Sequence, residues 1–298
     1  MSVRERLLLA FRGITFTFKD AYNACDDSAK ESVRARIYEN LGKDFRRIGR
    51  GVYVTIDSTC VLVEGDGRTL DFLEDESVDC IITDHPWKDY DANCGGNRNF
   101  SAYDCFEYDE KDFREKARVL KDGCFLCELI PAENASNFEC LFRLKKTAES
   151  SGFLYYAKVP WIKGTFVSNT GRKSKNSEDI MIFSKGPARA LRPDRQRGLN
   201  SGGNPVKFIS GTAKMLPADF NVQAVPANLK VCPSQKPFQL FEQLLEYVTR
   251  PGEIVLDQFA GSGSVGIACQ RTGRLAILIE KAKEQIEWIK KRLNFIDV

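Results

Sequence analysis

Residues 253–281 read EIVLDQFAGSGSVGIACQRTGRLAILIEK, and this stretch decides the fold. A buried-strand pattern ends at Asp257, and a glycine turn then opens a helix. Gly273 ends that helix, and a second apolar strand leads to Glu280. Strand, glycine turn, helix, strand and acid in this order predict an α/β fold with a doubly wound, Rossmann-like sheet.

The glycine turn also satisfies the dinucleotide pattern G-x-G-x-x-G at Gly261, Gly263 and Gly266. Two observations count against a nicotinamide oxidoreductase. The carboxylate of Asp257 would repel a pyrophosphate, and only 37 residues follow Gly261, too few for the remainder of such a domain. A ligand with an amine at one end and a ribose at the other fits better. S-adenosylmethionine has both, with its ammonium near Asp257 and its ribose hydroxyls donating to Glu280.

A second motif, SVDCIITDHPWKDY over 77–90, places polar groups after another predicted strand, 78–83. In open α/β sheets, ligands bind at the edge where such strands end. Asp84 and the main-chain carbonyl of His85 can both accept from an exocyclic amino group, and Trp87 can stack on the ring that carries it. Two acceptors localise the nitrogen lone pair for attack on a sulfonium methyl, so no covalent intermediate is needed.

Together these segments resemble the amino-group DNA methyltransferases, which make N6-methyladenine or N4-methylcytosine. The family signature Asp-Pro-Pro-Tyr stands here as Asp84-His85-Pro86-Trp87, and it precedes the cofactor motif in the permuted order. The resemblance runs from about residue 60 to the end. It implies an S-adenosylmethionine-dependent enzyme that flips adenine out of DNA and methylates N6, because aspartate opens the motif. The alternatives are an N4-cytosine enzyme, an RNA methyltransferase and an inactive DNA-binding homologue.

The resemblance also implies a cofactor-binding set. Asp66 takes the position near the adenosine, and Gln235-Lys236-Pro237 begins the helix that leads into the cofactor strand. The full predicted set is Asp66, Asp84, Gln235, Lys236, Pro237, Asp257, Phe259, Ala260, Gly261, Ser262, Gly263 and Glu280. His85 departs from the usual proline; only its carbonyl is required, so we expect activity to survive while the rigidity of the loop falls.

Residues 1–56 predict a separate domain with the order helix, strand, two helices and a hairpin. This order resembles the winged helix-turn-helix domains found beside restriction and modification enzymes, whose third helix enters the major groove while the hairpin contacts the backbone. The alternative is a basic cap without a ligand. The resemblance implies DNA contacts from Lys30, Arg34, Arg46, Arg47 and Arg50. The methyltransferase domain is then 57–298.

Charge is strongly segregated along the chain. Residues 57–157 carry 22 acidic against 11 basic side chains, whereas residues 158–236 carry 14 basic against 4 acidic. Two basic blocks around an acidic one indicate a polyanion that is contacted at two places. Within the second block, 186–231 occupies the target-recognition position of the family, and Arg189, Arg192, Arg195 and Arg197 suit phosphates or guanine edges. The segment 88–105 is expected to be a mobile loop over the flipped base.

Composition limits the remaining possibilities. Apolar residues make up 43% and charged residues 29%, and no apolar run is long enough to span a membrane. Ten cysteines without a signal sequence predict reduced thiols in a cytoplasm. Cys124 and Cys127 would point to opposite faces of a strand, so no metal site is expected. The partner is double-stranded DNA; a cognate restriction nuclease, and monomer versus homodimer, stay open.

Overall fold

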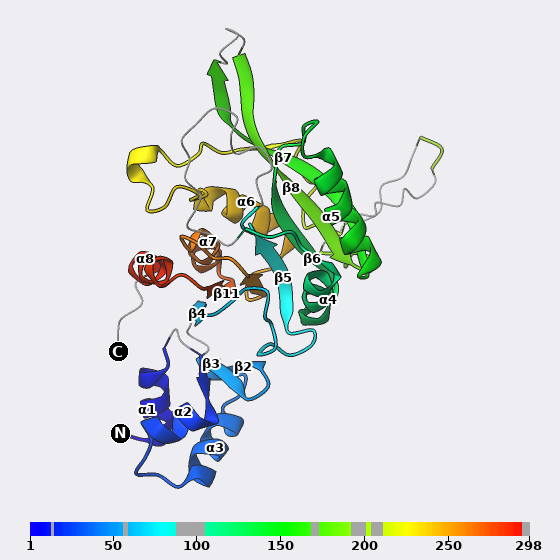
Figure 1. Ribbon diagram of the computed structural model, residues 1–298. Helices are drawn as coiled ribbons and strands as arrows, with labels where there is room; N and C mark the ends of the chain where they lie inside the picture. The colour runs from blue at the N-terminus through cyan, green and yellow to red at the C-terminus, as the bar shows by residue number, and fades with distance from the viewer. Residues whose placement is uncertain are drawn as a thin grey trace.

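The computed structural model describes residues 1–12, 15–55, 59–87, 105–167, 173–191, 201–203 and 211–293. These residues form a small N-terminal unit and a larger unit built on one broad sheet (Figure 1). No helix within these ranges is long and apolar enough to cross a membrane. The segment 88–104, with the loop expected over a flipped base, and Arg192, Arg195 and Arg197 lie outside the described residues.

The N-terminal unit has the predicted order of elements. It comprises α1 (Val3–Ala10), β1 (Phe16–Thr17), α2 (Phe18–Ala24), α3 (Lys30–Glu39), β2 (Phe45–Gly49) and β3 (Val52–Thr55). The three strands form an antiparallel sheet in the order β1-β3-β2. Capping boxes at Ser2 and Thr17 fix the starts of α1 and α2. Val33 and Ile37, one helical turn apart on α3, are fully buried in the core of this unit.

The larger unit contains a mixed eight-stranded sheet. Its strands are β4 (Cys60–Glu64), β5 (Val78–Thr83), β6 (Leu120–Pro131), β7 (Phe153–Val167), β8 (Lys173–Lys185), β9 (Phe220–Asn221), β10 (Ile254–Asp257) and β11 (Leu275–Glu280). The spatial order is β4-β11-β10-β5-β6-β8-β7-β9. The first five of these strands are parallel, whereas β8 runs antiparallel to both of its neighbours. The sheet is therefore doubly wound only in its parallel half.

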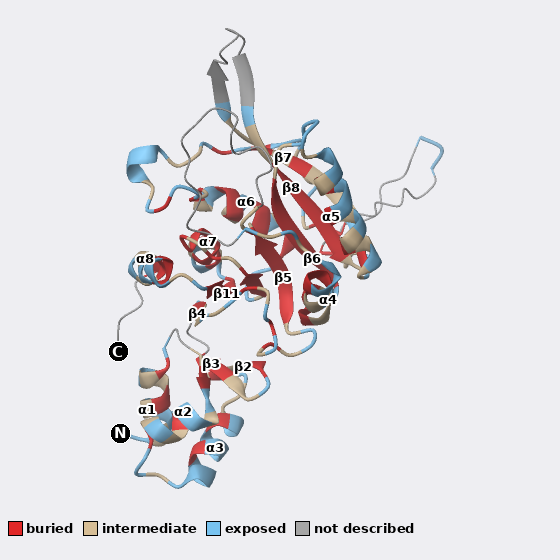
Figure 2. Cartoon of the chain, in the orientation of Figure 1, coloured by how far each residue is buried: buried red, intermediate tan, exposed pale blue. Residues whose placement is uncertain are grey.

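Helices cover both faces of the sheet. Helices α6 (Phe238–Val248), α7 (Ser264–Thr272) and α8 (Lys283–Leu293) pack on one face, and α4 (Glu110–Val119) and α5 (Phe138–Ser150) on the other. A short 3₁₀ turn spans Ala227–Leu229. Figure 2 shows the buried strands between these helical layers. Cys124 and Cys127 lie in the cores of opposite faces, as their spacing on one strand predicts.

The strand order reverses between β10 and β5, so a crevice is expected beyond their carboxyl ends. Asp84 directly follows β5, Asp257 ends β10 and Glu280 ends β11. Three carboxylates are thus delivered to one edge of the sheet by three adjacent parallel strands. The two motifs that carry the chemistry in the sequence meet at this switch point.

The hairpin β2–β3 docks on the larger unit at the opposite, amino-terminal edge of the sheet (Figure 1). Ile48 and Val54 are buried within the core of that unit, and an added Cβ at Gly49 would lie 1.7 Å from the carbonyl oxygen of Phe72. Arg46 donates to the carbonyl of Gly252, at 3.5 Å, in the turn before β10. The hairpin therefore joins the two units, while the N-terminal unit keeps a hydrophobic core of its own.

Three of the arginines expected at DNA have other partners. Arg47 forms an ion pair of 2.5 Å with Glu74, in the turn before β5. Arg189 makes a bidentate pair with Glu253, at 2.6 and 2.7 Å, directly before β10. With Arg46, these side chains hold the amino-terminal edge of the sheet, away from Asp84. We therefore do not include Arg46, Arg47 and Arg189 in the proposed DNA interface.

Candidate active site

The glycine turn between β10 and α7 has the conformation that its sequence requires. Gly261 and Gly263 have φ of +55° and +75°, which side-chain-bearing residues rarely adopt. Gly266 serves packing instead, because an added Cβ would lie 2.8 Å from a methyl group of Leu278 on β11. The turn thus brings main-chain N–H groups to the carboxyl end of β10, where a ligand can approach them closely.

Two buried carboxylates flank this turn. Glu280 accepts from the N–H of Gly261 and of Ala282, each at 2.8 Å, and so ties the end of β11 to the glycine turn. Asp257 accepts from the N–H of Phe259 at 3.2 Å. Burial raises the pKa of Asp257 to about 8, with the hydrogen bond from Phe259 opposing the rise and the nearby charges of Asp84 and Glu280 adding to it. A cationic ligand group would relieve this crowding of acids.

A pocket joins the glycine turn to the catalytic motif. Most residues of the predicted cofactor set line it: Asp84, Gln235, Lys236, Asp257, Phe259, Ala260, Gly261 and Ser262. Sequence reasoning missed six further lining residues: Thr83, Cys232, Ser234, Phe241, Ser264 and Val265. Thr83 and Ser264 directly adjoin the predicted positions Asp84 and Gly263, and this adjacency could have indicated that they line the pocket.

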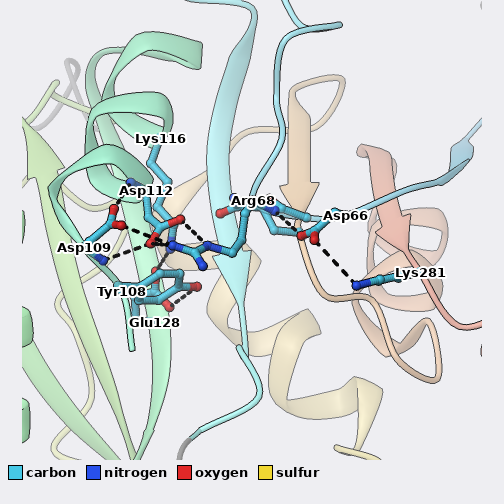
Figure 3. Close-up of polar contacts among 10 residues, drawn as sticks. Asp66, Arg68, Tyr108, Asp109, Asp112, Lys116, Glu128 and Lys281 are labelled. Carbon is cyan, nitrogen blue, oxygen red and sulfur yellow. Dashed lines mark hydrogen bonds and ion pairs between the residues drawn. The ribbon is translucent and has the colours of Figure 1, made fainter. Parts of the chain in front are cut away.

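The other members of the predicted cofactor set surround the pocket. Gly263 caps α7 and Pro237 precedes α6, while Glu280 reaches the pocket through Gly261. Asp66 is outside the lining; its carboxylate is 48% exposed and lies 3.8 Å from the ammonium of Lys281 (Figure 3). The placement of Asp66 at the adenosine end of a cofactor stays a prediction.

Asp84 begins a chain of alternating charges. Its Oδ2 lies 2.7 Å from the ammonium of Lys236, and the same ammonium lies 3.3 Å from Glu178 on β8. Glu178 pairs in turn with Lys163 on β7. Burial raises the pKa of Asp84, whereas Lys236 opposes that rise. Lys236 thereby favours the ionised form of Asp84, whose Oδ1 is not part of this ion pair.

Aromatic rings surround the motif on its other side. Trp87 donates from its indole N–H to the carbonyl of Leu129 at 3.2 Å, which fixes the orientation of its ring. The rings of Trp87 and Tyr108 lie 3.9 and 4.1 Å from the imidazole of His85, centroid to centroid. Phe106 lies 5.5 Å from the ring of Phe259, beside the glycine turn. These rings build an apolar wall next to Asp84.

Arg68 joins the loop after β4 to the start of α4, and no sequence motif pointed to it. Its guanidinium holds Asp112 through two hydrogen bonds of 2.7 and 2.8 Å and lies over the ring of Phe106 (Figure 3). The guanidinium of Arg68 also lies 3.3 Å from the carboxylate of Asp109, which caps the start of α4. This network fixes α4 against the loop that carries Asp66.

The remaining candidate DNA contacts lie on the N-terminal unit. Lys30 and Arg34 are exposed on α3, and their cationic groups lie over the rings of Tyr22 and Phe18, at 5.5 and 4.9 Å. Arg50 is exposed in the hairpin turn. Across the described part of the chain, no cluster of three or more histidine, cysteine or acidic side chains is arranged to hold a metal ion.

Comparison with known proteins agrees with this geometry. Residues 78–291 match the family described as DNA methylase (N6_N4_Mtase). The chain is 30% identical over 232 residues to the type II methyltransferase M.HpaI of Haemophilus parainfluenzae, covering 76% of this chain and 71% of that protein. It is 25% identical over 250 residues to the type II methyltransferase M2.DpnII of Streptococcus pneumoniae, covering 78% and 89%.

A solved structure shares the fold. The crystal structure of the M1.HpyAVI–SAM complex superposes with a TM-score of 0.54 at 22% identity, covering 79% of this chain and all of that one. The family match spans both the catalytic motif after β5 and the glycine turn after β10. The chain therefore belongs to the DNA methylase family of N6- and N4-amino-group methyltransferases.

Proposed function

We propose that this protein is an S-adenosylmethionine-dependent methyltransferase that methylates the N6 amino group of adenine in double-stranded DNA. The observation that carries the proposal is the single pocket lined by both Asp84 of the catalytic motif and Asp257 of the glycine turn. A methyl donor held at the glycine turn and an amino group held at Asp84 would share that pocket. The reaction needs this proximity.

The residues present fit the cofactor. Its ammonium matches the buried carboxyl of Asp257, whose pKa of about 8 reflects burial first and the neighbouring acids second. Its ribose hydroxyls match Glu280, and the cofactor can approach the main chain of Gly261 closely because that residue has no side chain. When bound, S-adenosylmethionine supplies an electrophilic methyl group on a sulfonium centre.

On the base side, the chain supplies two acceptors. Asp84 Oδ1 and the carbonyl of His85 would accept from the amino group, while Lys236 on Oδ2 favours the ionised carboxylate. Trp87, whose N–H is anchored to Leu129, presents its ring next to the motif. The target base has to leave the helix to reach this position, since its amino group is otherwise paired.

Adenine is preferred over cytosine on the resemblance stated above. Aspartate at position 84 opens the motif, whereas the N4-cytosine members of the family more often carry serine there. The N4-cytosine reaction stays the alternative, because the same two acceptors would serve its amino group.

We further propose that the N-terminal unit is a winged helix that contacts DNA beside the target site. Lys30, Arg34 and Arg50 are exposed on it and carry the charge that phosphates attract. In the larger unit, the candidate contacts are Arg192, Arg195 and Arg197. Neutralised phosphates make binding depend on salt, so the salt dependence of DNA affinity reports these contacts.

The test is methyl transfer from labelled S-adenosylmethionine to unmethylated duplex DNA, followed by digestion to nucleosides and mass spectrometry. We expect label on N6-methyladenine. Label on N4-methylcytosine would keep the reaction and reverse the base. Absence of label on DNA, with cofactor binding intact by calorimetry and label on structured RNA, would reject DNA as the substrate. Absence of label on both would leave a protein that only binds DNA.

A further inference from the structure

The residue that departs most from the family motif is enclosed by a specific set of partners. Proline at position 85 would fix its own φ, whereas histidine does not. Nevertheless the side chain of His85 is almost fully buried, with 2% of the residue exposed. The only part of residue 85 that the proposed reaction needs is its main-chain carbonyl. The question is therefore what holds that carbonyl in place.

Two aromatic rings pack closely against the imidazole. Trp87 lies 3.9 Å and Tyr108 4.1 Å away, each tilted by about 45°. Trp87 is fixed by Leu129, and the returning segment is fixed by a hydrogen bond of 3.3 Å from the N–H of Phe106 to the carbonyl of Pro86. The imidazole has therefore little freedom to rotate, and its backbone shares that restriction.

A buried ionic group lies near the imidazole; its two members, Lys116 and Glu128, are drawn in Figure 3. Lys116 of α4 and Glu128 of β6 form an ion pair in which neither side chain is exposed. The ammonium of Lys116 also lies 3.6 Å from the centroid of the Tyr108 ring. The second oxygen of Glu128 lies 3.5 Å from the Tyr108 hydroxyl and 3.9 Å from Nδ1 of His85. Nδ1 is buried and has no hydrogen-bond partner among the residues that the structure describes.

Core packing alone does not account for this group. A buried ion pair is costly to desolvate, and apolar side chains of the same volume would fill the space at least as well. Moreover, α4 is anchored at its start by the pair between Arg68 and Asp112, so Lys116 sits on a rigid element. Trp87, Tyr108 and Glu128 thus surround the imidazole next to Asp84 in the chain, and Lys116 holds Glu128 in place. This arrangement suits the positioning of residue 85.

We propose that His85 is a positioning residue, whose buried imidazole packs against Trp87, Tyr108 and Glu128 so that its main-chain carbonyl stays fixed as the second acceptor for the target amino group. This clamp takes over the restraint that proline supplies elsewhere in the family. The inference rests on the proposed function, since it concerns the same methyl transfer.

The electrostatics agree with a positioning role. Burial and the neighbouring ammonium of Lys116 hold the pKa of His85 well below its usual value, so the ring is neutral at physiological pH. A neutral ring can donate one N–H toward Glu128. Burial also raises the pKa of Glu128, while Lys116 favours its ionised form. The titratable and charged groups that face the imidazole are thus Glu128, Lys116 and Tyr108.

The experiment compares single-turnover methyl transfer by wild type, His85→Ala and His85→Pro, with active sites counted by cofactor binding. We expect His85→Ala to slow the step on the order of a hundredfold, as a misplaced acceptor would, with unchanged cofactor affinity. His85→Pro should regain most of the loss. The matched control is Arg114→Ala, which removes an exposed cation from the same helix as Lys116 and should leave the rate unchanged.

A second variant keeps the inference testable if His85→Ala does not fold. Tyr108→Leu removes one ring of the clamp and should by itself slow transfer with unchanged cofactor affinity, and where His85→Ala folds it should add little to that variant. His85→Ala at the wild-type rate, His85→Pro as slow as His85→Ala, or independent effects of positions 85 and 108 would each overturn the proposal. Wild-type protein that transfers no methyl group to either base would instead reject the proposed function.

Discussion

Replacement of Lys236 by methionine should move the acid limb of the pH–rate profile to higher pH. Asp84 accepts hydrogen bonds at both oxygens only when it is ionised. Burial already raises the pKa of Asp84, and the ammonium of Lys236, 2.7 Å away, opposes that rise. Loss of the ammonium therefore raises the pKa of Asp84 further. Activity that requires the carboxylate is then lost at a higher pH as the medium is acidified.

The magnitude follows from the geometry. Two unit charges 4 Å apart attract by roughly 1 kcal/mol in water and about 4 kcal/mol near a protein surface. The two side chains are 16% and 27% exposed, so an intermediate value on the order of 2 kcal/mol applies. Each 1.4 kcal/mol of attraction lost moves an acid limb by about one pH unit. Glu178→Gln has the opposite sign, because Glu178 repels Asp84 and shares the same ammonium.

The assay is kcat for methyl transfer between pH 5 and 9, with both substrates saturating. Lys214→Met is the matched control. It removes an exposed lysine that pairs with Glu246 on α6 and takes no part in the charge chain of Asp84. The acid limb should move up for Lys236→Met, down for Glu178→Gln and not at all for the control. If Lys236→Met and Glu178→Gln moved it in the same direction, the electrostatic account of Asp84 would be refuted.

Four further outcomes are expected. Asp84→Ala should keep cofactor binding, measured by calorimetry, and abolish methyl transfer; transfer at the wild-type rate would remove the mechanism. Cofactor affinity should rise with pH up to about 8, because Asp257 has a pKa of about 8 and must lose its proton to solvent before it can pair with a cationic ligand, and Asp257→Asn should remove that rise. Alanine at both Lys30 and Arg34 should lower the slope of DNA affinity against salt by about two, one for each phosphate contact; an unchanged slope would make α3 a structural cap. Gly266→Ala should lower the free energy of unfolding by about 1–3 kcal/mol, measured in urea, because its methyl group would crowd a leucine on β11, whereas unchanged stability would show that this leucine moves aside.

Local patterns predicted the parts of the site that depend on one continuous segment. Strand β5 occupies 78–83 as its apolar run indicates, and Gly273 ends α7 in the left-handed conformation. Both features follow from neighbours in the chain: alternation and apolarity set the strand, and glycine removes the penalty for positive φ. The position of Asp257 at the strand end follows in the same way.

Local sequence patterns did not predict the contacts between segments that are far apart in the chain. Glu178 joins Asp84 only because β8 inserts between β6 and β7, and the sequence alone does not indicate that strand order. Likewise Lys116 and Glu128 appear as an ordinary helix surface residue and a strand residue until α4 packs on β6. Arg189 was assigned to DNA from its charge and its place in the expected target-recognition region, yet it pairs with Glu253, because a basic side chain in an irregular segment suits an internal carboxylate equally well.

The docking of the hairpin also changes what the N-terminal unit can do. Its contacts with Phe72, Glu74 and Gly252 all lie before strands β5 and β10, whereas Asp84 follows β5. A six-residue strand is about 20 Å long, so the two sites are separated by at least the height of the sheet. If Lys30 and Arg34 contact phosphates as proposed, they do so on duplex displaced from the flipped base. Because Gly49 leaves no room for movement against Phe72, that displacement is fixed by the fold. Loss of these cations should therefore weaken DNA binding while leaving the methyl-transfer step itself unchanged.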